Sequence, residues 1–149
     1  MKKYLVFTDL DGTLLDHENY SYGNNKKTIT SIINNKNDVI FNTSKTFSES
    51  INLLKKLNLT NMPFSTENGA LLYFPKNRFK KIKNSSDYGK YWKIRIAKLS
   101  SKNWHQFLLK KQKKFKLLIA QDLPSKILKK YTNLDNTSKM LNREASQII

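Results

Sequence analysis

Two aspartates stand close together directly after an apolar segment near the amino terminus. The apolar segment is Tyr4-Leu5-Val6-Phe7-Thr8, and Asp9-Leu10-Asp11-Gly12-Thr13 follows it. A continuous apolar run of this length that ends in a loop predicts a buried strand. An irregular loop allows both carboxylates to point the same way, and ligands of open α/β sheets bind at the carboxyl ends of strands. The pair therefore predicts a binding or catalytic site.

This spacing suits phosphoryl transfer. Asp9 would attack a phosphorus atom and form an aspartyl phosphate, while Asp11 would protonate the leaving oxygen and later activate water. Because two carboxylates repel an anionic phosphate, we expect Mg2+ as a cofactor, with Asp9 and Asp11 as its ligands. Gly12 would let backbone N–H groups approach the phosphate oxygens. Asp-rich turns after strands also occur as purely structural features.

The surrounding elements alternate between strand and helix. Strands are predicted at residues 4–8 and 38–42, and each is followed by a helix, a short one around residues 29–33 and one from about Thr46 to Leu57. Thr46 and Glu49 have capping-box spacing, which marks the start of the second helix. Short strands at residues 63–66 and 70–75 flank the turn Glu67-Asn68-Gly69. The alternation predicts an α/β fold.

The region after Pro75 has a different texture. Residues 91–96 alternate aromatic or aliphatic with basic side chains, and residues 100–111 carry apolar side chains at helical spacing. Residues 115–119 alternate as a strand would. Asp122 and Pro124 open a predicted helix in which Ile127 and Tyr131 share a face. A last short helix is predicted over about residues 136–143.

Charge is unevenly distributed along the 149 residues. Residues 1–75 hold eight basic and seven acidic side chains, whereas 20 basic and four acidic ones follow from Lys76 onward, for a net charge of +17. This shift predicts a boundary between two structural units. Five lysines within residues 110–116 keep open a basic module, such as one for nucleic acid. We favour solvated lysine-rich faces and do not expect nucleic acid as the partner.

Cysteine is absent, which excludes a disulfide framework and a cysteine zinc site. The apolar run at residues 4–8 is too short for a signal-peptide core or a membrane span. We therefore expect a cytoplasmic chain with no membrane partner. The sequence leaves the oligomeric state open.

The string from Phe7 to Asp16 closely resembles the first motif of the haloacid dehalogenase-like phosphohydrolases. In that superfamily a Ser or Thr at the end of the next core strand binds the transferring phosphoryl group. Thr43, Ser44 and Lys45 stand in that place here, so the resemblance implies that they bind the substrate phosphate. A Thr-Ser pair before a helix is also a simple helix cap, and the two roles are compatible.

Further stretches resemble mannosyl-3-phosphoglycerate phosphatases. They are residues 43–46 with Glu49, Glu67-Asn68-Gly69-Ala70 with residues 73–75, and Asn142-Arg143-Glu144. The resemblance implies an α/β, haloacid dehalogenase-like (Rossmannoid) three-layer core that is incomplete, with an inserted α+β cap. Residues 1–79 would be the amino-terminal part of the core and residues 80–149 an incomplete cap.

The same resemblance implies a Mg2+-dependent phosphatase acting on a small phosphorylated molecule, a mannosyl- or glucosyl-3-phosphoglycerate, in the synthesis of a compatible solute. Asp11 would also reach Mg2+ through its backbone carbonyl, and Arg143 would bind the glycerate carboxylate unless it is only a solvated helix-end cation. A general sugar-phosphate phosphatase of the same superfamily is the alternative within the class. An inactive fragment that acts as a basic binding module is the alternative from another class.

Two parts of the family's machinery have no match among residues 1–149. They are a lysine that neutralises the phosphoryl group and a second acidic pair for Mg2+, both of which follow the cap in the family. We therefore expect a truncated phosphatase that is poorly active by itself. Without later strands, the strand at residues 4–8 would be an apolar edge, which predicts a tendency to aggregate.

Overall fold

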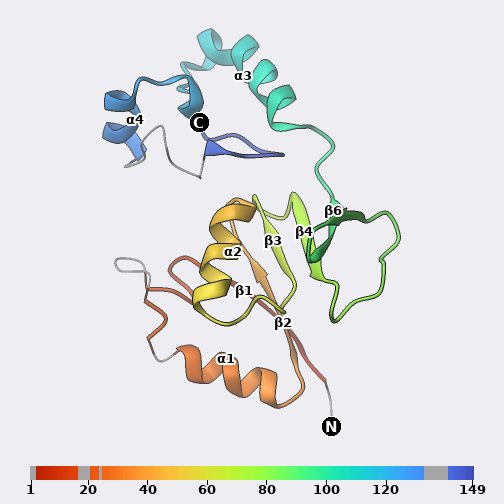
Figure 1. Cartoon of the computed structure of the whole chain (residues 1–149). Coiled ribbons are helices and arrows are strands. Elements are labelled where there is room, and N and C mark those ends of the chain that lie inside the picture. The colour runs from red at the N-terminus through yellow and green to blue at the C-terminus, as the bar shows by residue number, and fades with distance from the viewer. Residues whose placement is uncertain (1–2, 17–20, 24, 133–140) are drawn as a thin grey trace. The chain divides into compact units, whose positions relative to one another are not determined.

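The computed structural model describes residues 3–16, 21–23, 25–132 and 141–149 (Figure 1). The chain forms two compact units, Met1–Ile96 and Ala97–Ile149. All the described strands belong to the first unit, whereas the described elements of the second are helices. No helix within the described ranges is long and apolar enough to cross a bilayer.

One mixed sheet forms the centre of the first unit. Its strands are β1 (Leu5–Asp9), β2 (Asp38–Asn42), β3 (Phe64–Thr66), β4 (Leu71–Pro75), β5 (Ser86–Tyr88) and β6 (Tyr91–Arg95). They lie in the order β1-β2-β3-β4-β6-β5. The pairs β1–β2 and β2–β3 are parallel, and the other three pairs are antiparallel. The carboxyl ends of β1 and β2 therefore reach the same edge of the sheet.

Two helices make the crossovers between the parallel strands. Helix α1 (Asn25–Asn34) connects β1 to β2, and α2 (Phe47–Lys56) connects β2 to β3, as Figure 1 shows. The predicted capping box is confirmed, since Glu49 Oε2 accepts from the backbone N–H of Thr46 at 2.9 Å and from its hydroxyl at 2.7 Å. Buried side chains of the sheet and of α2 form the core, among them Val39, Phe41, Leu54, Phe64, Leu71 and Tyr73.

Strand β1 lies at the edge of the sheet. The expectation of a fully buried strand is wrong, because Leu5 and Phe7 are 55% and 65% exposed. The expectation of an apolar edge is confirmed, since β1 pairs with β2 alone among the described strands. Leu5 and Phe7 are two residues apart, and side chains at this spacing lie on the same face of a strand.

The second unit contains α3 (Ser101–Phe115), a 3-10 turn (Ala120–Asp122) and α4 (Ser125–Thr132). The strand predicted over residues 115–119 is wrong, because α3 continues to Phe115 and ends at Lys116, which adopts φ +51°. Residues 117–119 are irregular and lead into the 3-10 turn. Most of the helix predicted over 136–143 lies outside the described residues, and Asn142 and Arg143 are not helical.

The boundary between the two units falls after Ile96. Strand β5, which the sequence did not predict, pairs with β6, and β6 pairs with β4. Residues 86–95 therefore extend the sheet of the first unit. The assignment of residues 1–79 to a core and 80–149 to a cap stays a prediction.

Candidate active site

The loop after β1 folds around the carbonyl oxygen of Leu10. The backbone N–H groups of Leu14 and Leu15 both donate to this oxygen, at 3.1 and 2.8 Å. Gly12 adopts φ +70°, a left-handed conformation that glycine reaches without a steric penalty. Leu10 and Leu15 are buried, so they anchor the loop to the core. The two aspartates flank this anchor in the sequence.

The loop after β2 lies beside the end of β1. Asp9 is opposite Asn42 in the parallel register, so both strands end level with each other. Thr43 follows, is 2% exposed, and its Oγ1 accepts a hydrogen bond from the backbone N–H of Lys45 at 3.2 Å. Ser44 is exposed between them. The register thus brings the predicted phosphate-binding hydroxyls to the edge where the aspartates lie.

A strained turn holds the loop after β2 in place. Glu67, Asn68 and Gly69 all have positive φ, at +52°, +60° and +84°. The backbone N–H of Glu67 donates to the carbonyl of Lys45 at 2.9 Å, and that of Asn68 donates to the carbonyl of Thr43 at 3.0 Å. Because successive non-glycine residues resist this conformation, it persists only where the surroundings enforce it. The turn is therefore built into the site.

These three loops enclose a small hollow of about 280 Å³. Six polar residues line it, namely Asp9, Asp11, Asn42, Thr43, Ser44 and Asn68. The structure thus brings together four residues that the sequence singled out, the two aspartates and the two hydroxyl residues. Their chemical roles stay predictions.

Asn42 and Asn68 were not predicted as site residues. Each carried a signal, because Asn42 is the polar residue that ends an apolar strand, and Asn68 is the centre of a turn already noted as a motif. The hydroxyl of Ser65 on β3 donates to Asn42 Oδ1, which orients the amide. Sequence reasoning missed Asn42 because the level ends of the strands become evident only from the register, and Asn68 because its backbone N–H bonds to Thr43, 25 positions away in the sequence.

Three other predicted residues do not line the hollow, although one of them contacts Asp11. Lys45 Nζ forms an ion pair with Asp11 Oδ2 at 2.9 Å and its side chain is 12% exposed. Gly12 lines a separate hollow of about 440 Å³. Arg143 belongs to the second unit, where its guanidinium donates to Ser146 Oγ at 2.8 Å. Substrate binding by these three residues stays a prediction.

The donor set at the hollow suits Mg2+. Asp11 Oδ1 is buried and accepts no hydrogen bond from the described residues, a state that is costly for a carboxylate unless a cation or water meets it. Mg2+ takes oxygen ligands, commonly from one or two carboxylates with waters completing its shell. Asp9 and Asp11 fit this pattern. No group of three or more Asp, Glu, His or Cys side chains in the described part of the chain forms a larger metal cluster.

The fold and the motif define the class of protein. A family model described as haloacid dehalogenase-like hydrolase matches residues 6–148, and the chain belongs to this family. Solved structures agree on the fold. A haloacid dehalogenase-like hydrolase from B. subtilis matches with a TM-score of 0.54 at 17% identity, covering 74% of this chain and 34% of that one. A Thermotoga maritima protein matches with a TM-score of 0.51 at 20% identity, covering 91% and 48%.

Curated relatives share a more specific name, glucosyl-3-phosphoglycerate/mannosyl-3-phosphoglycerate phosphatase. The relative from Methanococcoides burtonii is 33% identical over 142 residues, which are 93% of this chain and 52% of that protein. The relative from Persephonella marina is 38% identical over 96 residues, or 56% of this chain and 35% of that protein. The chain thus spans about half the length of the first relative and about a third of the length of the second. The resemblance inferred from the motifs is confirmed.

Proposed function

We propose that the hollow at the ends of β1 and β2 is the active site of a phosphate monoester hydrolase. The observation that carries the proposal is the gathering of two aspartates and two hydroxyl residues in one small hollow. The family of hydrolases to which the chain belongs and the name of its relatives support the same chemistry. We further propose that the substrate is a mannosyl- or glucosyl-3-phosphoglycerate.

In the first step Asp9 is the nucleophile. Its carboxylate oxygen attacks phosphorus and forms an O–P bond, while the bond between phosphorus and the ester oxygen breaks. Asp11, in its protonated form, donates its proton to the leaving oxygen. The glycosyl glycerate leaves as an alcohol, and the phosphoryl group stays on Asp9.

In the second step water replaces the aspartate. Asp11, now ionised, takes a proton from a water molecule as the water oxygen attacks phosphorus. The bond between phosphorus and Asp9 breaks, which releases inorganic phosphate and regenerates both carboxyl groups. Asp11 thus serves first as acid and then as base.

The loop after β2 would hold the transferred group. The hydroxyls of Thr43 and Ser44 can donate to phosphate oxygens, and they precede α2, whose amino terminus favours an anion. Asp9 through its carboxylate and Asp11 through its backbone carbonyl would hold Mg2+, which would neutralise charge on the phosphate. The ion pair with Lys45 fixes Asp11 from the side of its second oxygen.

The test is phosphate release by the whole chain with Mg2+. Mannosyl-3-phosphoglycerate, glucosyl-3-phosphoglycerate and a simple sugar phosphate are compared, together with Asp9→Asn and the exposed-carboxylate control Asp122→Asn. We expect release from the phosphoglycerates, its loss in Asp9→Asn and its retention in the control. Faster release from the sugar phosphate would instead favour a general sugar-phosphate phosphatase.

The nucleophile can be identified even if the chain hydrolyses its substrate slowly. Mass spectrometry after rapid quenching should find one phosphoryl group on the peptide that contains Asp9, and none in Asp9→Asn. Release that persists unchanged in Asp9→Asn would contradict the mechanism.

A further inference from the structure

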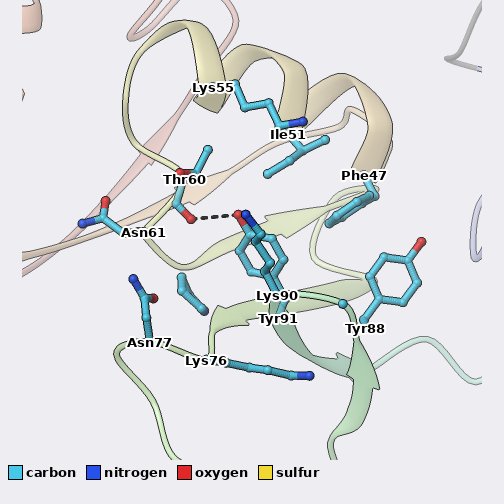
Figure 2. Close-up of a pocket in the computed structure, with 12 residues that line it drawn as sticks. Phe47, Ile51, Lys55, Thr60, Asn61, Lys76, Asn77, Tyr88, Lys90 and Tyr91 are labelled. Atoms are coloured by element: carbon cyan, nitrogen blue, oxygen red, sulfur yellow. Dashed lines mark hydrogen bonds between the residues drawn. The ribbon is translucent and has the colours of Figure 1, made fainter.

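A groove of about 970 Å³ lies on the first unit along α2 and takes no part in the proposed chemistry. It lies between α2, the turn after β4 and the β5–β6 hairpin (Figure 2). Twelve residues line it, namely Phe47, Ile51, Lys55, Thr60, Asn61, Pro75, Lys76, Asn77, Tyr88, Gly89, Lys90 and Tyr91. This volume is at the upper end of the range for small-molecule sites.

One face of α2 forms a wall of the groove. Phe47, Ile51 and Lys55 are spaced four residues apart, so they lie in one row along the helix. Eight residues of helix span about 12 Å at 1.5 Å per residue. The row changes from aromatic to aliphatic to cationic along this length, so one end of the wall is apolar and the other is positively charged.

Aromatic rings form one end of the groove. Phe47 and Tyr88 lie on the same side of Figure 2, and their rings meet edge to face with centroids 4.9 Å apart. The ring of Tyr91 lies 6.0 Å from that of Phe47 and is 5% exposed. Phe47 and Tyr88 are half-buried and line the groove, so part of each ring is open to a flat ligand, whereas Tyr91 is buried and Lys93 Nζ already lies 4.6 Å from the centroid of the Tyr88 ring.

Hydrogen bonds fix the loops around the groove. Tyr91 donates its hydroxyl proton to the carbonyl of Thr60 at 2.8 Å, which ties the hairpin to the loop after α2. The backbone N–H of Lys76 donates to the carbonyl of Lys90 at 3.0 Å, which ties the hairpin to the turn after β4. Gly89 provides the positive φ of +58° that the hairpin turn requires. The groove is therefore preformed.

The charge around the groove is positive. Three lysines and no acidic residue are among its lining residues. Lys76 already has partners outside the groove, because its ammonium pairs with Asp87 at 2.6 Å and lies over the Trp92 ring. Lys55 and Lys90 form no ion pair within the described residues. Asn61 and Asn77 add amides at the side opposite Phe47 in Figure 2.

Most of the groove lies away from the aspartate hollow along the strands, although Phe47 begins α2 directly after the loop that lines the hollow. Strand β4 runs antiparallel to β3, with Leu71 opposite Thr66 and Tyr73 opposite Phe64. The carboxyl end of β3, where the hollow lies, and Pro75 are therefore at opposite ends of the strands. The two lining sets share no residue.

The geometry points to a second binding site, for a mononucleotide. A ligand that suits this groove has a flat ring for the aromatic end, a negative charge for Lys55 and Lys90, and polar edges for the asparagine amides. A nucleobase stacks on aromatic side chains, and its phosphate pairs with lysines. A plain phosphate would leave the aromatic end empty, and an uncharged ring would leave the lysines unpaired.

Calorimetry of the whole chain in EDTA tests the proposal, with 5′-AMP, adenosine and inorganic phosphate as separate probes. EDTA prevents Mg2+-dependent turnover. We expect 5′-AMP to bind at least tenfold more tightly than either part alone. The double variant Lys55→Gln/Lys90→Gln should weaken 5′-AMP about tenfold or more, an effect expected from the loss of charge-assisted contacts.

Matched variants separate this groove from other anion sites. Lys56→Gln removes the neighbouring lysine of α2, which does not line the groove, and should leave binding unchanged. Tyr88→Leu should weaken 5′-AMP without changing the affinity for phosphate. Equal affinity for phosphate and 5′-AMP, or a loss of 5′-AMP binding in Thr43→Ala but not in the lysine double variant, would overturn the proposal. The second result would assign the nucleotide to the aspartate hollow.

Discussion

Lys45 and Asp11 form an ion pair in which the ammonium nitrogen lies 2.9 Å from Oδ2 of the carboxylate. The other oxygen of the same carboxylate, Oδ1, is buried and accepts no hydrogen bond within the part of the chain that the structure describes. Oδ2 of Asp11 is thus fixed by the ammonium group of Lys45, while Oδ1 is available for the proposed proton transfer. The proposed acid and base is oriented by its neighbour.

This relationship predicts a split effect of Lys45→Met on catalysis. If Lys45 positions Asp11, kcat should fall about tenfold to a hundredfold, a partial loss of the roughly hundredfold to ten-thousandfold that general acid–base catalysis contributes. KM should change little, and Lys45→Arg should recover part of kcat because it restores the cation. Steady-state phosphate release measures both constants. A large rise in KM with kcat unchanged would instead support the substrate-binding role inferred from the sequence.

The ion pair between Lys45 and Asp11 should also contribute to the free energy of unfolding. In a double-mutant cycle with Lys45→Met and Asp11→Asn, we expect a coupling free energy of about 1 kcal/mol, as for partly exposed ion pairs. Urea denaturation of the four proteins measures it. Strict additivity of the two single changes would show that the pair contributes nothing to folding.

The capping box of α2 predicts a second stability effect. Glu49→Ala removes the acceptor of both the N–H and the hydroxyl of Thr46, so we expect unfolding to become easier by about 1 kcal/mol. Glu49→Gln should lose less because its side chain still accepts one bond. Thermal denaturation compares them with Lys56→Ala at the other end of the helix. Equal losses in Glu49→Ala and Lys56→Ala would argue against the cap.

Local patterns predicted the first half of the fold well. The capping-box spacing of Thr46 and Glu49 located the start of α2, and the apolar segment at residues 38–42 located β2. These features depend on residues close in the sequence. The aspartates and the hydroxyls were also found from sequence, because each pair directly follows a strand that ends at the same edge of the sheet.

The errors came from long-range pairing and from one ambiguous local pattern. Strand β5 has only three residues and exists because β6 pairs with it. Phe115 alternates with Leu117 and suggested a strand, but it closes a helix whose last turn is followed by Lys116 in the left-handed region. Asn42 joined the hollow through the register with Asp9, which no local pattern contains.

Asp38 predicts a pH dependence of stability. Its hydrogen bond with Lys3 lowers the pKa of the carboxyl most, burial opposes this, and the hydrogen bond with Arg78 lowers the pKa further. The folded state therefore favours the ionised form. This contribution is complete above the unfolded pKa of about 4 and is lost as pH falls through the lower folded pKa.

The corresponding measurement is urea denaturation at pH 7 and at pH 3. Asp38→Asn should destabilise the chain at pH 7 and have a smaller effect at pH 3, where part of the contribution is already lost in the parent. Lys3→Met and Arg78→Met should show the same trend, whereas Lys56→Met should not. A penalty for Asp38→Asn that is the same at both pH values would contradict the linkage.

The exposed edge of β1 predicts self-association. Leu5 and Phe7 are 55% and 65% exposed on one face of a strand that offers unpaired backbone groups, which favours contact with a second copy. Phe7→Thr replaces the ring by a β-branched side chain that suits a strand, so we expect the association constant to fall about thirtyfold, since burial of such a side chain contributes about 2 kcal/mol. Sedimentation equilibrium measures this change. Phe115 on α3 is 59% exposed and serves as the matched control. If Phe115→Thr lowers association as much as Phe7→Thr, the general apolar surface and not the edge of the sheet drives it.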